Sequence, residues 1–275
     1  MSEAEPGRAR RLAALRAVWR KLAGPPRAVL RASGGRRLVA AVGVAVLATA
    51  AAMLLLDPIG LDAVGTWSRS TMRVFRTITS FGDSAWYLVP SGLALIALGF
   101  VPPASRRVEA ALGEIWLRFA FFFLAVAGTG IAVNVGKRLI GRVRPLHVEP
   151  GMVWHFEPLG WKSAAASFPS GHATTAFAVV TALALLGGPR FVRLGLPWLV
   201  AGALLVCLSR VVLGAHFPSD VMAGALFGTL GTWWFAHFLA RRRLVFRQTA
   251  PGALALRGAH ASKTLRAVLA GDKVS

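Results

Sequence analysis

The chain has 275 residues, of which 55% are hydrophobic and 16% charged, and its mean hydropathy is +0.58. A soluble domain of this length would carry more charge, so the composition favours an integral membrane protein. The formal net charge of +21 is typical of nucleic-acid binding, but the basic residues gather at the two ends and in short turns beside apolar runs. Juxtamembrane Lys and Arg explain that pattern, so we expect no nucleic-acid partner.

Apolar runs long enough, or nearly so, to cross a bilayer as helices recur along the chain. They fall at about residues 38–56, 84–101, 116–136, 172–188, 195–214 and 218–240. The sequence therefore predicts an all-α fold, an integral membrane bundle of six transmembrane helices. The run at 172–188 is short, so we expect its outer end to extend into the preceding segment. We divide the chain into a basic arm (1–37), a membrane domain (38–240) and a basic tail (241–275).

The basic residues also predict the orientation in the membrane. Residues 1–37 contain ten Lys and Arg, and residues 241–275 contain eight. Six crossings place both ends on one side, and the positive-inside rule makes that side cytoplasmic. The first 56 residues are too long for a cleaved signal peptide, so a retained signal anchor is the better interpretation. We expect a multi-pass protein of the inner (plasma) membrane.

Three short elements fall at the outer ends of the predicted helices. Lys137 to Pro145 follows the third helix, Pro169 to His172 precedes the fourth, and Ser209 to Asp220 joins the fifth to the sixth. The loop at 137–171 has no clear periodicity, and loops of this length are often functional. Its cations lie on the outer face, against the positive-inside rule, which also favours a functional role.

These elements carry three cations and three acid–base groups, which are Lys137, Arg144 and Arg210, and His172, His216 and Asp220. Ionisable residues at membrane depth are costly and usually meet in one cavity. Two histidines and an aspartate could bind zinc, but three neighbouring cations would repel a divalent metal. The set therefore favours an anion site for a phosphate ester, with arginines binding phosphate bidentately and lysine acting as a point charge. We expect no cofactor.

The local sequence is suited to phosphate chemistry. Ser170 and Gly171 precede a helix whose free backbone N–H groups could cradle an oxyanion. Asp220, in the first turn of the last helix, is placed to accept a hydrogen bond from one ring nitrogen of His216, which leaves the other as a nucleophile. His172 would protonate the leaving oxygen and then activate water.

Other polar residues of the outer loops have simpler interpretations. Arg138, Arg142 and Lys162 are expected to face solvent or lipid headgroups, and His147 and His155 to be ordinary loop residues. The pair Gly82 and Asp83, before the second apolar run, is interpreted as structural.

The motifs Lys-x6-Arg-Pro, Pro-Ser-Gly-His and Ser-Arg-x5-His-x3-Asp, spread over residues 137–220, resemble the type 2 phosphatidic acid phosphatase superfamily (PAP2, the lipid phosphate phosphatases). All eleven fixed positions match, and the six-helix layout over 38–240 is similar to the family's membrane branch. The resemblance implies a metal-independent phosphatase with His216 as nucleophile, Asp220 orienting it, and His172 as acid and then base. It also implies a set of phosphate-binding residues, namely Lys137, Arg144, Ser170, Gly171 and Arg210.

The resulting hypothesis is a lipid phosphatase that works through a phosphohistidine at the outer membrane face. Undecaprenyl diphosphate, phosphatidate, phosphatidylglycerol phosphate and lipid A phosphates are all candidate substrates, and monophosphate or diphosphate preference stays open, as does the oligomeric state. A phosphohistidine could also pass its phosphoryl group to another lipid, so a phosphotransferase is an alternative. A transporter is disfavoured because the ionisable residues gather at one face rather than at mid-membrane. A non-catalytic membrane protein is disfavoured because every position that the chemistry needs is intact.

Overall fold

The structure is a computed structural model that describes residues 16–24, 31–102, 105–149, 151–250 and 253–258. Most of the predicted basic arm and the end of the basic tail lie outside these ranges. The described residues are mostly helical, which confirms the all-α class. They belong to two compact units. The larger unit comprises Arg36–Pro90 and Phe122–Trp233, and the smaller comprises Met1–Gly35, Ser91–Phe121 and Trp234–Ser275.

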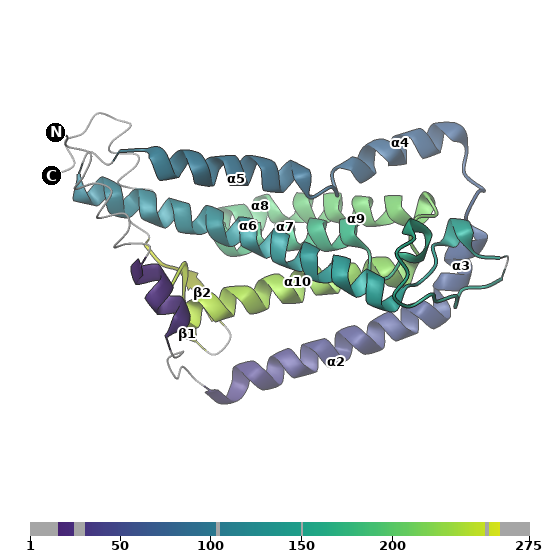
Figure 1. Ribbon diagram of the computed structural model, residues 1–275, viewed down its shortest axis with the longest axis horizontal. Helices are drawn as coiled ribbons and strands as arrows, with labels where there is room; N and C mark the ends of the chain where they lie inside the picture. Colours follow the sequence, from purple (N-terminus) through teal and green to yellow (C-terminus); the bar gives the residue numbers. More distant parts are fainter. Residues whose placement is uncertain (1–15, 25–30, 103–104, 150, 251–252, 259–275) are drawn as a thin grey trace. The chain divides into compact units, whose positions relative to one another are not determined.

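The helices can be followed in chain order in Figure 1. They are α2 (Arg31–Leu55), α3 (Asp57–Asp62), α4 (Arg69–Ser80), α5 (Ala85–Phe100), α6 (Arg106–Ile140), α7 (Gly171–Leu186), α8 (Pro189–Leu194), α9 (Leu196–Val212) and α10 (Pro218–Arg241). Two short 3-10 helices, η1 (Pro145–His147) and η2 (Ser163–Ala165), lie between α6 and α7. An antiparallel hairpin of β1 (Phe246–Ala250) and β2 (Ala253–Leu256) follows α10 and pairs Phe246 with Leu256.

Within the described ranges, three helical stretches are long and apolar enough to cross a membrane. They are Arg36–Leu55, Arg69–Phe100 and Arg107–Ile140, and two shorter apolar helices cover Gly171–Leu186 and Leu196–Val212. Large apolar side chains on these helices are exposed, including Leu47 of α2 and Ile131 of α6. Such exposed apolar faces are typical of contact with lipid. The number of six crossings and the side of the termini stay predictions.

Two boundaries differ from the sequence-based expectation. The segment 57–83, which lies between the first two predicted runs, forms α3 and α4. Ser68 caps α4 by accepting a hydrogen bond from the backbone N–H of Thr71 at 3.2 Å, which satisfies a free donor of the first turn. The expected outward extension of the fourth apolar run is wrong, because α7 begins at Gly171 after Ser170 adopts an extended backbone.

Helix α9 lies against both α7 and α4 in the larger unit (Figure 1). Ala176 and Val180 of α7 form a buried cluster with Ala203 and Val206 of α9, and Ile78 of α4 packs against it. The small alanines allow close approach of the helices, and the buried apolar contacts hold α4 beside α9. This packing brings the C-terminal end of α4 beside α7 and α9.

Helices α7 and α10 also approach each other closely. A Cβ atom at Gly224 would lie 2.3 Å from the carbonyl oxygen of Ser170, and one at Gly228 would lie 2.3 Å from that of Thr174. Only glycine fits at these two positions. The backbone N–H of Ser170 also donates to the carbonyl oxygen of Asp220 at 2.9 Å. The first turns of the two helices are therefore fixed to each other.

The smaller unit is held by aromatic and carbonyl contacts. Trp116 of α6 donates from its indole N–H to the carbonyl oxygen of Leu95 in α5 at 3.1 Å. Phe121 stacks on Phe235 of α10 and meets the edge of Phe246 in β1, with ring centroids 5.8 and 4.8 Å apart. These contacts join the cytoplasmic halves predicted for α5 and α6 to the start of the hairpin.

Candidate active site

The residues predicted for phosphate chemistry all belong to the larger unit. Lys137 lies near the end of α6 and Arg144 in the loop after it, Ser170, Gly171 and His172 begin α7, Arg210 lies in the last turn of α9, and His216 and Asp220 flank the start of α10. The fold brings these residues close enough to interact. The charges of Arg210, His216 and Lys137 all act on His172. Arg144 and Arg210 in turn act on Lys137.

His216 is 2% exposed, and its ring is fixed by a backbone carbonyl. Its Nδ1 atom lies 2.7 Å from the carbonyl oxygen of Ser167. A carbonyl oxygen only accepts hydrogen bonds, so Nδ1 carries the proton and Nε2 keeps its lone pair. The same ring atom is 3.8 Å from Oδ2 of Asp220, too far for a hydrogen bond. The expected direct bond to Asp220 is thus replaced by one to Ser167, a residue that the sequence analysis did not select.

The protonation state of His216 follows from its burial. Removal from water disfavours the charged imidazolium and lowers the pKa of His216 to about 4, although the charge of Asp220 opposes this shift. The ring is therefore neutral at pH 7. A neutral ring with Nδ1 protonated presents an unprotonated Nε2, which is the form that a nucleophilic histidine needs.

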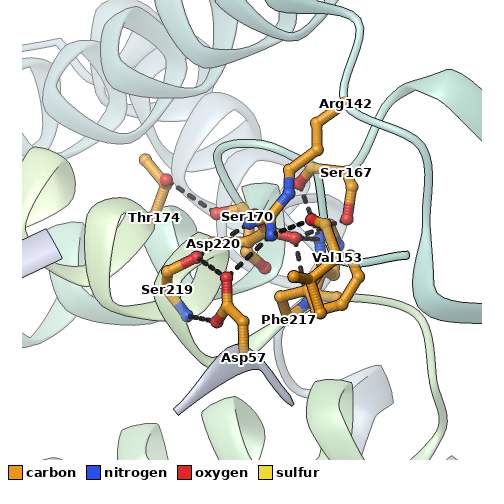
Figure 2. Close-up of polar contacts among 10 residues, drawn as sticks. Asp57, Arg142, Val153, Ser167, Ser170, Thr174, Phe217, Ser219 and Asp220 are labelled. Carbon is orange, nitrogen blue, oxygen red and sulfur yellow. Dashed lines mark hydrogen bonds and ion pairs between the residues drawn. The ribbon is translucent and has the colours of Figure 1, made fainter. Parts of the chain in front are cut away.

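Asp220 is completely buried and its carboxylate is held by donors on both oxygens (Figure 2). Oδ1 accepts from Arg142 at 2.6 Å. Oδ2 accepts from the hydroxyl of Ser167 at 2.5 Å and from the backbone N–H of Phe217 at 2.9 Å. Ser167 therefore contacts both members of the pair, with its carbonyl on His216 and its hydroxyl on Asp220. The carboxylate is ionised and fixed in one orientation.

Arg142 corrects the sequence-based interpretation. It was expected to face solvent or headgroups, but it is 0% exposed. Its guanidinium donates to Asp220, to Asp57 at 2.7 Å, to the hydroxyl of Ser219 at 2.8 Å and to the carbonyl oxygen of Val153 at 2.8 Å. A buried guanidinium is stable only with such partners, and the nearby pair of carboxylates supplies them. Asp57 was also missed, because nothing near it in the sequence carries a motif.

The other loop cations fit their simpler interpretations. Arg138 donates to the carbonyl oxygen of Trp161 at 2.6 Å, close to the surface, while Lys162 and His147 are exposed. In the described part of the chain, none of these three side chains hydrogen-bonds a member of the predicted site, although the backbone N–H of His147 donates to the carbonyl oxygen of Arg144 at 2.9 Å.

The surroundings of the three cations include buried donors that no residue of the described chain satisfies. Lys137 lies so close to Gly171 that a Cβ atom there would be 3.1 Å from Nζ. Arg210 donates to the hydroxyl of Thr79 in α4 at 2.9 Å. Among the described residues, Nε of Arg144, Nε of Arg210 and Oγ of Ser170 are buried without a hydrogen-bond partner. Buried donors of this kind normally find an acceptor, and an oxyanion supplies several.

Gly82 makes room for the second histidine. A Cβ atom at Gly82 would lie 2.9 Å from Cβ and Cδ2 of His172 and 2.7 Å from a methyl group of Val206. The absence of a side chain in the turn between α4 and α5 therefore lets His172 reach its place. This agrees with the structural interpretation of Gly82.

The arrangement combines a neutral imidazole ring, a second histidine and three cations. No three His, Cys, Asp or Glu side chains among the described residues gather as metal ligands would. Phosphoryl transfer needs positioning and compensation of negative charge more than covalent chemistry from the protein, and this set of residues can supply both.

Comparison with known proteins agrees with this chemistry. The family model of the PAP2 superfamily matches residues 118–244. Lipid A 1-phosphatase of Rhizobium johnstonii is 37% identical over 204 residues, which cover 73% of this chain and 80% of that protein. The chain belongs to the PAP2 superfamily. The predicted family is therefore confirmed, and so is the prediction of a lipid phosphatase.

Two further comparisons concern activity and fold among PAP2 proteins. Decaprenylphosphoryl-5-phosphoribose phosphatase of Mycobacterium tuberculosis is 37% identical over 161 residues, 56% of this chain and 72% of that protein. A transmembrane PAP2-type phosphatidylglycerolphosphate phosphatase from Bacillus subtilis has a TM-score of 0.53 at 23% identity, covering 73% of this chain and 94% of that one. The apolar helices and this PAP2 neighbour identify the chain as a membrane protein.

Proposed function

We propose that the chain removes the 1-phosphate of lipid A through a phosphohistidine on His216. The choice of substrate rests on the 37% identity with the Rhizobium johnstonii lipid A 1-phosphatase. This similarity covers 80% of that protein, so it is not confined to the three motifs. The buried, neutral His216 beside three cations supports the mechanism.

In the proposed complex, the phosphate occupies the space between Lys137, Arg144 and Arg210. The two arginines donate to its oxygens, Lys137 adds a third positive charge, and Ser170 with the first backbone N–H groups of α7 completes the contact. The anion supplies acceptors for the buried Nε and Oγ atoms. It also offsets the mutual repulsion of the three cations.

The proposed reaction has two steps. Nε2 of His216 attacks phosphorus, the bond from phosphorus to the lipid oxygen breaks, and His172 gives that oxygen its proton. His172 then takes a proton from water, which attacks the phosphohistidine. The phosphorus–nitrogen bond breaks, phosphate leaves, and Nε2 regains its lone pair. Asp220 stays ionised throughout and stabilises the positive charge that develops on the ring of His216.

We place this reaction on the periplasmic face of the inner membrane, with both termini in the cytoplasm. The distribution of Lys and Arg over the predicted loops supports this orientation. A periplasmic reporter fused after Glu149 should be active and one fused at the C-terminus inactive. The opposite pair of results would invert the orientation.

The substrate is tested with one purified preparation and a panel of lipids. Lipid A carrying both phosphates should lose the 1-phosphate, detected by mass spectrometry, faster than phosphatidate, phosphatidylglycerol phosphate or undecaprenyl diphosphate releases phosphate. His216→Ala should show neither turnover nor covalent labelling by phosphate. Labelling that survives in this variant would show that another residue is the nucleophile. A parent enzyme that is active on other lipids of the panel but not on lipid A would reject lipid A as the substrate.

A second candidate comes from the Mycobacterium tuberculosis relative, which suggests a polyprenylphosphoryl sugar phosphate as the substrate. The same panel should therefore include such a lipid. A phosphotransferase is distinguished by adding an acceptor lipid, because phosphate would then appear on the acceptor instead of in solution.

A further inference from the structure

A buried ion network joins the segment after α2 to the proposed active site (Figure 2). Arg142 lies between two carboxylates, with Nη1 2.6 Å from Asp220 and Nη2 2.7 Å from Asp57. All three side chains are 0% exposed. Asp57 lies outside residues 118–244, which the family model matches, so the network reaches beyond the three motifs.

Asp57 acts on the start of α10 as well as on Arg142. Its Oδ1 accepts the backbone N–H of Ser219 at 2.9 Å, and its Oδ2 accepts the hydroxyl of Ser219 at 2.6 Å. Burial raises the pKa of Asp57, and the hydrogen bonds from Ser219 and Arg142 oppose that rise. Every hydrogen-bond partner of this carboxylate among the described residues is a donor, which is the pattern that an ionised aspartate requires.

An aromatic ring also contacts Arg142. One ring face of Phe217 lies 4.0 Å from the centre of its guanidinium, a favourable cation–π geometry. Phe217 in turn donates its backbone N–H to Asp220 at 2.9 Å. The residues on both sides of Pro218 are therefore held by the network, and His216 directly precedes them.

We propose that Arg142 and Asp57 are positioning residues for the reaction, acting through Asp220 and the turn at Phe217–Ser219. Arg142 fixes the orientation of the carboxylate that faces His216, and Asp57 fixes both Arg142 and the backbone at Ser219. Neither residue hydrogen-bonds His216 in the structure, so their effect on the nucleophile is indirect. This inference rests on the proposed roles of His216 and Asp220.

Steady-state kinetics on a lipid phosphate test it with changes that remove one charge each and with matched controls. Asp57→Asn is compared with Asp62→Asn, because Asp62 is an exposed carboxylate on the same helix. Arg142→Gln is compared with Arg138→Gln, because Arg138 is a nearby arginine that donates to the carbonyl oxygen of Trp161 rather than to the network. Loss of orientation should lower kcat by about 10- to 100-fold in the two network variants, with little change in KM. The two controls should match the parent enzyme.

A double-mutant cycle separates positioning from a general loss of structure. If Arg142 and Asp57 act through Asp220, adding either change to Asp220→Asn should lower kcat little further. Effects that multiply with that of Asp220→Asn, or network variants as active as their controls, would overturn the proposal. Melting curves show which variants are folded. If Arg142→Gln does not fold, the double-mutant cycle is measured with Asp57→Asn and Asp220→Asn.

The same variants distinguish failure of the proposed function from failure of this inference. An active His216→Ala variant would reject the nucleophile itself. An inactive His216→Ala variant beside fully active Asp57→Asn and Arg142→Gln variants would reject only the positioning role.

Discussion

Ser167 contacts His216 through its backbone and Asp220 through its side chain. The carbonyl oxygen accepts from Nδ1 of His216 at 2.7 Å, and the hydroxyl donates to Oδ2 of Asp220 at 2.5 Å. The orientation of the ring is therefore insensitive to the identity of residue 167, whereas the orientation of the carboxylate is not. The two effects can be separated by a single substitution.

Ser167→Ala should keep the carbonyl contact with His216 and remove one of the donors to Asp220. A hydrogen bond to a charged group contributes about 1.5–3 kcal/mol, so kcat should fall by about tenfold or more. Ser163→Ala, an exposed position on η2, is the control. Equal kcat values for the two variants would show that the hydroxyl has no part in the reaction.

The acid limb of phosphoenzyme formation should lie near pH 4, because His216 attacks only in its deprotonated form. A decline towards higher pH would instead report loss of the proton that His172 donates in the same step. Burial lowers the pKa of His216 from 6.5 to about 4, so the folded protein binds the inactivating proton only as the pH falls towards 4. Rapid-quench labelling measures this step directly. An acid limb centred near pH 6.5 would mean that His216 titrates as an exposed histidine.

The same shift has a consequence for stability. The unfolded chain takes up a proton on this histidine as the pH falls through 6.5, whereas the folded chain does so near 4. Its contribution to the free energy of unfolding is therefore complete above about pH 6.5 and declines as the pH drops towards 4. Melting temperatures of the parent and of His216→Ala in the same detergent should converge at low pH, and parallel curves would contradict this.

Gly224→Ala should destabilise the contact between α7 and α10. The new methyl group would lie 2.3 Å from the carbonyl oxygen of Ser170, which is backbone and has little freedom to move. Overpacking of this kind costs about 1–3 kcal/mol, and unfolding in denaturant measures it. Gly202→Ala on α9 is the matched control because no atom lies within 4 Å of its new Cβ. A stable, fully active Gly224→Ala would show that the helices can separate without harm.

Phosphate release should continue in excess EDTA. Lys137, Arg144 and Arg210 supply the positive charge that a metal ion provides in other phosphoryl-transfer sites. Vanadate should inhibit, because it can occupy the same site as a trigonal-bipyramidal mimic. Strict dependence on an added divalent metal would contradict the mechanism, and Arg144→Lys should raise KM if the guanidinium binds phosphate bidentately.

The motif residues were predictable because their chemistry and their place at helix ends are local properties. The loop position of Arg144 after α6 and the start of α10 at Pro218 lie as the sequence indicated. Their roles in the reaction stay predictions. Helix α4 was not foreseen, because the arginines at 69, 73 and 76 interrupt the hydrophobic pattern that indicates a membrane helix.

The network partners were not predictable for a different reason. Asp57 and Arg142 are 85 positions apart in the sequence, and neither charge has a local pattern that says whether it is buried. Arg142 had one signal, a cation on the outer face against the positive-inside rule, but its neighbours shared it. Ser167 acts on His216 through its carbonyl, which every residue possesses, so no side-chain pattern could have selected it.

The Asp57–Arg142 pair determines how short a fragment of this enzyme can be while the active-site residues keep their partners. A fragment cut at the family boundaries, residues 118–244, would keep every motif residue and still lose Asp57, Thr79 and Gly82. Arg142 would lose one of its two counter-charges, Arg210 its hydroxyl partner, and His172 the glycine that makes room for it. Grafting the three motifs onto another bundle would therefore transfer the reacting groups without the support that orients them, and a chimera must carry residues 57–82 along with them.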